Sequence, residues 1–185
     1  MRTKSVLIPA LSLICFSAGL LFANQTLAKE IRIGAKEMHG MEIGAVYLQP
    51  VEMEPANMMR AAKDSDVHME ADIKALEGNT NGFSKDSWIP YLGVSYELTN
   101  ISTKESQKGE FMPMVANDGP HYGDNIKLSG PGKYKLKLTI SPPSENKHAH
   151  FGRHTDKETG TGEWFKTFSV EYEFTYAGTG KKGAE

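Results

Sequence analysis

Side chains able to bind a metal ion are concentrated in three short polar segments of this chain, residues 67–72, 112–123 and 146–156. The chain has six histidines and nine methionines, while its one cysteine, Cys15, lies near the N-terminus. Imidazole, carboxylate and thioether donors without a thiolate form a ligand set suited to copper or iron outside the cytoplasm. The composition therefore indicates a metal-binding protein.

The first segment has the two-residue period of a half-buried strand. Apolar side chains occupy the odd positions from 67 to 73, and polar ones occupy the even positions from 68 to 74. His68, Glu70 and Asp72 therefore project from one face, with about 7 Å between successive members. Two neighbours on such a face can bind a metal ion if a loop supplies a third donor. The alternative is a solvent-facing polar edge, since Lys74 continues the pattern.

The second segment is expected to bring a methionine close to a histidine. A strand ends near Met114, and an Asp-Gly-Pro turn then holds His121 in a restricted, glycine-flanked loop. The turn can return His121 toward Met114. A thioether is a soft ligand that suits Cu(I), although methionine also fills irregular gaps in hydrophobic cores.

The remaining donors are less specific. The third segment has the composition of a loop, in which His148 and His150 could be a surface pair without function. His154 precedes a Thr-Gly-Thr-Gly turn and is more constrained. A further methionine cluster could pass Cu(I) along or could fill the core; its members are Met53, Met58 and Met59.

Residues 1–28 have the pattern of a secretory signal peptide. Arg2 and Lys4 supply the positive start, an apolar run covers about residues 6–22, and small residues end at Ala28. The run is marginal for a membrane span, and a retained anchor is the alternative. Small residues do not precede Cys15, so lipidation is not expected. We expect residues 29–185 to form the mature domain, which does not span the membrane.

That domain is predicted to be all-β. Short segments rich in β-branched and aromatic residues are bounded by Gly, Pro, Asn or Ser, and they cover residues 43–48, 67–74, 91–98, 134–140 and 168–176. Residues 55–64 could hold one short helix. The pattern predicts an immunoglobulin-like antiparallel β-sandwich. Once the signal peptide is removed, 19 basic residues face 23 acidic ones, which argues against a nucleic-acid partner.

Six stretches of the chain resemble the FetP/FtrA-type periplasmic iron-uptake proteins of bacteria. They are GMEIGAVYLQPVEMEP, DVHMEADI, GNTNGF…WIPYLGVSYEL, FMPMVANDGPHYGDNI, GRHTDKETGTGEWFK and FSVEYEFTY. The resemblance covers about residues 41–176, in the same order and spacing. It implies a periplasmic homodimer with an immunoglobulin-like fold and a copper site close to the dimer interface. It also implies delivery of iron to an inner-membrane permease.

The resemblance also implies a set of metal ligands. The His-x-Glu strand motif of the family falls on His68 and Glu70, and the Met-Pro-Met methionine falls on Met114. The Gly-Pro-His-Tyr-Gly histidine falls on His121, and the late loop histidine falls on His154. The family pattern has no counterpart for His148 and His150.

The expected function is binding of copper ion and iron ion in support of iron import. Iron would prefer carboxylate and imidazole donors, so His68, Glu70 and Asp72 are its expected contacts. Two alternatives are a copper chaperone or tolerance protein and a copper-dependent Fe(II) oxidase. Because the sequence contains no Ser/His/Asp or paired-carboxylate arrangement, a transport component is favoured over an enzyme. Metal affinity is expected to fall as the pH drops through the histidine range near about 6.5.

Overall fold

The computed structural model describes residues 30–178, and the predicted signal peptide lies outside the described residues. The described part contains eight strands and two single-turn 3-10 helices. The elements are β1 (Ile31–Met38), β2 (Met41–Leu48), η1 (Ala62–Asp64), β3 (Val67–Ala75), β4 (Gly93–Asn100), β5 (Ser106–Ala116), β6 (Gly119–Ile126), β7 (Gly132–Ser141), η2 (Pro143–Glu145) and β8 (Phe168–Tyr176). No helix in residues 30–178 is long and apolar enough to cross a membrane.

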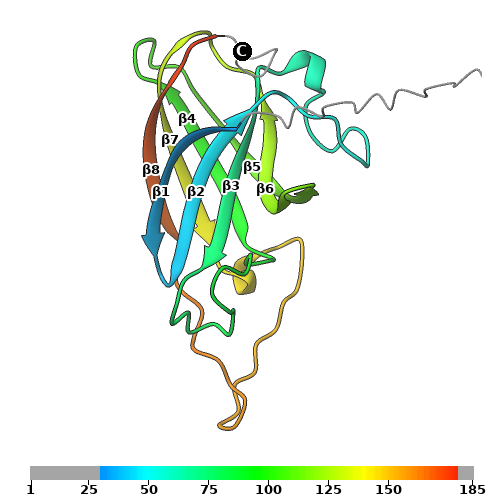
Figure 1. The fold of residues 1–185 in the computed structure, drawn as a ribbon, viewed down its shortest axis with the longest axis vertical. Coiled ribbons are helices and arrows are strands. Elements are labelled where there is room, and N and C mark those ends of the chain that lie inside the picture. Colours follow the sequence, from blue (N-terminus) through cyan, green and yellow to red (C-terminus); the bar gives the residue numbers. More distant parts are fainter. Residues whose placement is uncertain (1–29, 179–185) are drawn as a thin grey trace, which may run out of the picture.

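The strands form one antiparallel sheet that curls almost into a closed barrel (Figure 1). Their order is β1-β2-β3-β6-β5-β4-β7-β8, and the curvature of the sheet brings the two edge strands, β1 and β8, next to one another. The Tyr172 hydroxyl of β8 donates a hydrogen bond of 2.7 Å to the Ile43 carbonyl of β2, which ties β8 to the strand beside β1. The predicted all-β antiparallel sandwich is confirmed. Its two layers belong to one continuous sheet, because β5 pairs with β4 on one side and with β6 on the other.

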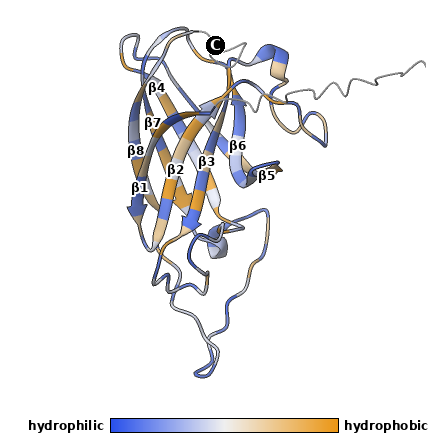
Figure 2. Ribbon diagram, viewed as in Figure 1, coloured by the Kyte–Doolittle hydropathy of each residue, from blue (hydrophilic) through white to orange (hydrophobic). Residues whose placement is uncertain are grey.

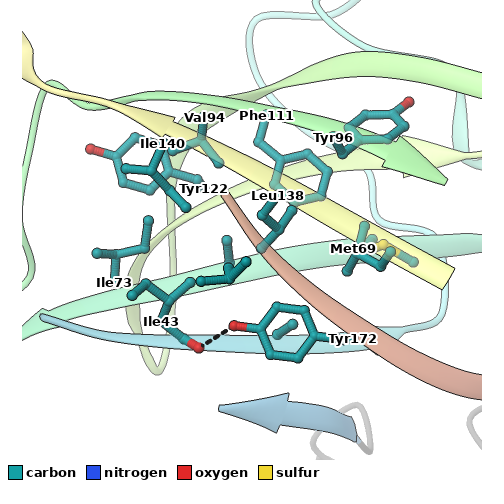
Figure 3. Packing of buried hydrophobic residues seen from close by; sticks show 14 of the residues in the cluster. Ile43, Met69, Ile73, Val94, Tyr96, Phe111, Tyr122, Leu138, Ile140 and Tyr172 are labelled. Atoms are coloured by element: carbon teal, nitrogen blue, oxygen red, sulfur yellow. Dashed lines mark hydrogen bonds between the residues drawn. The ribbon is translucent and has the colours of Figure 1, made fainter. Parts of the chain in front are cut away.

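Alternation along the strands creates the core. On β7, every second residue from Tyr134 to Ile140 is buried, while the lysines between them are directed outward. Figure 2 shows the same alternation of hydrophobic and hydrophilic residues along the strands. Ile43, Ile73 and Leu138 meet inside, as Figure 3 shows. Removal of this apolar surface from water is the main stabilising contribution to the fold.

The sequence located five of the eight described strands to within a few residues, but it missed β1, β6 and most of β5. It also placed His121 in a loop, whereas this residue lies on β6. Where a short helix was expected in residues 55–64, the structure has only turns and η1. The longest connection, residues 142–167, joins β7 to β8 and extends below the barrel in Figure 1.

Candidate metal centre

His68 and Glu70 lie on the polar face of β3, and both are buried. β3 pairs with β2 on one side and with β6 on the other, so it is an interior strand of the sheet. The exposed fractions are 1% for His68 and 5% for Glu70. The alternative of a solvent-facing polar edge is therefore wrong for these two residues. Buried charged and polar groups are unfavourable unless they have partners, which makes this pair a candidate site.

The β5–β6 hairpin brings Met114 and His121 together. These two residues are cross-strand partners, and the chain reverses between Ala116 and Gly119. The sequence prediction that the turn returns His121 toward Met114 is confirmed. His121 is 4% exposed, and because β6 also pairs with β3, its ring faces Glu70.

Three donor atoms converge at this point. Glu70 Oε1 lies 3.5 Å from His68 Nε2 and 3.4 Å from His121 Nε2. The centroids of the two imidazole rings are 5.8 Å apart, and the ring planes are inclined at 72°. Neither Nε2 atom has a hydrogen-bond partner, although both are buried. Together they form a group whose ligand atoms all lie within 4.8 Å of one another, the spacing that could hold a metal ion.

The cluster opens into a cavity of about 640 Å³. Met114 lines this cavity together with the three converging residues, so a thioether is available beside two imidazoles and a carboxyl group. Further carboxyl groups belong to Glu30, Glu52 and Asp118, which also line it. The cavity therefore combines soft and hard donors under a negative rim that attracts cations.

Burial sets the protonation states of the cluster. It lowers the pKa of His68 to about 4, against a smaller opposing effect of its hydrogen bond to Asn125. It also lowers the pKa of His121. Burial raises the pKa of Glu70 to about 8, helped by the charges of Asp72 and other nearby carboxylates. At neutral pH the metal-free cluster thus holds two neutral imidazoles and a protonated carboxyl group, so its close His–Glu contacts are not salt bridges.

Asn125 fixes which nitrogen of His68 faces the cavity. The Asn125 amide nitrogen donates to the carbonyls of Val51 and Arg60, at 2.8 and 2.9 Å, so its oxygen is left as the acceptor. That oxygen lies 3.0 Å from His68 Nδ1, which must therefore carry the proton. The lone pair is on Nε2 and points toward Glu70. Such outer partners orient metal-binding histidines and set their tautomer.

Gly123 provides the space that His68 occupies. A Cβ atom at this position would lie 2.8 Å from His68 Nε2 and 3.1 Å from the Met69 carbonyl oxygen. Neither Gly123 nor Asn125 was expected from the sequence to be functional. The available signal was their two-residue spacing after His121, which places all three on one face once β6 is recognised as a strand.

The other predicted donors are elsewhere in a single chain. His154 lies on the exposed loop between β7 and β8, where its Nδ1 is 2.8 Å from Thr159 Oγ1. It is not among the residues that line the cavity, so its assignment as a ligand stays a prediction. His148 and His150 are exposed on the same loop. Asp72 is half-buried one step beyond Glu70 on β3.

The fold and the buried cluster define an antiparallel β-sandwich protein with a candidate metal centre inside its sheet. The family described as Fe2+ transport protein matches residues 27–178, and the chain belongs to this family. A UPF0423 protein of Brucella abortus is 65% identical over 184 residues, which cover 99% of this chain and 97% of the relative. The 34 kDa membrane antigen of Treponema pallidum is 40% identical over 133 residues, covering 70% of this chain and 64% of that protein.

Solved structures of the FetP and P19 type have the same fold. FetP of uropathogenic Escherichia coli strain F11 superposes with a TM-score of 0.77 at 55% identity, covering 81% of this chain and 97% of FetP. The copper-reconstituted P19 protein of Campylobacter jejuni superposes with a TM-score of 0.78 at 51% identity, covering 82% of this chain and 98% of P19. The resemblance to FetP-type proteins inferred from the sequence is confirmed.

Proposed function

We propose that this protein is a periplasmic copper- and iron-binding protein that supports iron import through an inner-membrane permease. Membership of the iron-transport family supports the link to iron. Copper-bound structures of FetP and P19 support the link to copper. The observation that carries the proposal is the convergence of His68 Nε2, His121 Nε2 and Glu70 Oε1, two of which are buried nitrogens without a partner.

The donor set fits copper. His68, Glu70, Met114 and His121 would hold the ion, because imidazole suits both oxidation states and the thioether suits Cu(I). The carboxyl group of Glu70 would ionise on binding, since a cation stabilises the charged form that burial disfavours. A bound copper ion would supply the capacity for one-electron redox chemistry.

Iron is the proposed cargo. The carboxyl groups along the cavity, together with His68, are the hard donors that iron prefers. Asp72 is half-buried on the same face of β3 and extends this set. A homodimer is part of the proposal because His154, which is remote from the cavity in its own subunit, could then act from a partner subunit. Export rests on the signal-peptide pattern of residues 1–28, and FetP has been produced in the periplasm of Escherichia coli.

Growth of a deletion strain separates this proposal from the copper-tolerance alternative. We expect the deletion to slow growth on limiting iron, and we expect added copper not to restore it. Complementation should succeed with the wild-type gene and with the surface control Glu77→Gln, but fail with Glu70→Gln. A deletion strain that grows normally on limiting iron but is killed by copper would refute the proposal in favour of copper tolerance.

The oxidase alternative has its own test. Purified copper-loaded protein is mixed with excess Fe(II) in air, and Fe(III) formation is followed over many equivalents. We expect at most a stoichiometric reaction, because the protein is proposed to bind and pass on iron. Multiple turnovers that His121→Ala abolishes would establish an enzyme instead.

A further inference from the structure

The loop between β2 and η1 carries a group of methionines that the proposed metal centre does not use. We refer to residues 51–60 as the methionine loop; its sulfur-bearing residues are Met53, Met58 and Met59. The sequence alone left open whether these residues fill the core or handle Cu(I). The structure distinguishes them, because Met53 lines the metal cavity whereas Met58 is 57% exposed.

Both ends of the methionine loop are attached to the metal centre by one side chain. Asn125 accepts a hydrogen bond of 3.2 Å from the Val51 amide and donates to the carbonyls of Val51 and Arg60. The same amide oxygen accepts the Nδ1 proton of His68. Asn125 is 2% exposed, so these bonds are shielded from water and correspondingly strong. These bonds anchor both ends of the loop beside the cavity.

Met53 lies near the start of the loop, where it is the less exposed member of a short polar stretch. Met53 is half-buried, while its neighbours Glu52 and Glu54 are exposed. Met53 lies on the wall of the cavity that Met114 lines from the β5–β6 hairpin. Two thioethers therefore border the same cavity from two different parts of the chain. The imidazoles of His68 and His121 line it as well.

We propose that Met53 is a second thioether ligand in this cavity, and that it favours binding of copper in the Cu(I) state over the Cu(II) state. This inference rests on the proposed function of the cavity as a copper site. Thioether sulfur is a soft donor that Cu(I) accepts readily, while Cu(II) and iron ions gain more from imidazole and carboxylate donors. Met53 therefore biases the cavity toward reduced copper, and Glu70 with the imidazoles serves the harder ions.

The first test observes the methionine methyl groups directly. The protein is labelled with 13C at the methionine methyls, and Ag(I) is added as a redox-inert substitute for Cu(I), followed by Cu(I) itself without oxygen. We expect the methyl resonances of Met53 and Met114 to shift with saturation at one equivalent, while the resonance of Met58 stays in place. A Met53 resonance that does not move while that of Met114 does would overturn the inference.

The second test compares affinities in matched variants. Cu(I) affinity is measured by competition with a chromophoric Cu(I) chelator, and Cu(II) affinity is measured with a separate Cu(II) competitor. We expect Met53→Leu to weaken Cu(I) binding about tenfold or more and to change Cu(II) binding less than about threefold. Met58→Leu, in the same loop but outside the cavity, should change neither.

These outcomes separate the inference from the proposed function. Equal Cu(I) affinity in Met53→Leu and Met58→Leu would overturn the role of Met53 while leaving the copper site intact, provided that Met114→Leu still weakens binding. Copper affinity that is indifferent to Glu70→Gln and Met114→Leu would refute the cavity as the copper site, and the inference would fall with it.

Discussion

Replacement of Glu70 by glutamine should stabilise the metal-free protein at neutral pH. Glutamine has nearly the size of glutamic acid and no charge, and its amide N–H can donate to the unpartnered Nε2 of His68. The glutamate must instead be held protonated in the fold, because its pKa there is about 8 compared with 4.5 in a model compound. At neutral pH this carboxyl group is ionised in the unfolded chain and must take up a proton on folding, which lowers the free energy of unfolding. Glutamine needs no such proton uptake.

The magnitude follows from linkage. A folded-state pKa above the unfolded one means that the stability associated with the protonated form is complete below about pH 4.5 and is lost as the pH rises toward about 8. Each pH unit between these limits corresponds to about 1.4 kcal/mol. At pH 7 the buried carboxyl group therefore costs about 3 kcal/mol, which is an upper estimate for the gain in the free energy of unfolding on Glu70→Gln.

The assay is chemical denaturation of chelator-treated wild type and Glu70→Gln at several pH values from 5 to 8. The difference between the two proteins is the quantity of interest, because His68, whose pKa is lowered, affects both proteins alike at the acidic end. We expect this difference to grow with pH, and the exposed Glu77→Gln control to show no such growth. A difference that does not depend on pH, or a less stable Glu70→Gln at pH 8, would refute the assignment of Glu70 as a buried neutral acid.

Three further predictions concern metal binding. Because Glu70 must ionise when a divalent ion binds, binding should release about one proton at pH 7. The affinity for the ion should therefore rise about tenfold per pH unit from about 6 to 8. Titration calorimetry in buffers of different ionisation enthalpy measures both the proton release and the affinity. Gly123→Ala should displace His68 and weaken binding about tenfold or more, whereas Gly152→Ala, whose Cβ would contact nothing, should bind normally. His154→Ala should weaken copper binding only at protein concentrations at which sedimentation shows a dimer; an equal loss in the monomer would contradict a role from the partner subunit.

The pH prediction revises an expectation drawn from the sequence. Two histidines and a glutamate suggest an affinity that falls through the usual histidine range. Burial moves both imidazole pKa values downward and moves the glutamate into the neutral range. The sequence could not reveal that Glu70, rather than a histidine, sets the pH range in which affinity falls, because a side chain's burial depends on which segments cover it. Here the covering comes from the methionine loop and the β5–β6 hairpin.

The sequence predicted those parts of the fold and site that depend on local pattern. The alternation in residues 67–74 correctly placed His68 and Glu70 on one face of a strand, and the turn chemistry correctly paired Met114 with His121. Strands with a weak alternating pattern were missed, since Pro113, Gly119 and Pro120 interrupt the β5–β6 hairpin. Asn125 was missed because its role arises from contacts with residues 57 to 74 positions away in the chain.

The central claim is that one metal ion binds where His68, Glu70 and His121 converge, and crystallography of the copper-loaded protein tests it most directly. Anomalous diffraction data on either side of the copper absorption edge would locate the ion. We predict a single strong peak within bonding distance of both Nε2 atoms and the Glu70 carboxylate, and its loss in Glu70→Gln combined with His121→Ala. A fully occupied peak at the exposed His148 and His150 pair, with none inside the sheet, would contradict the account.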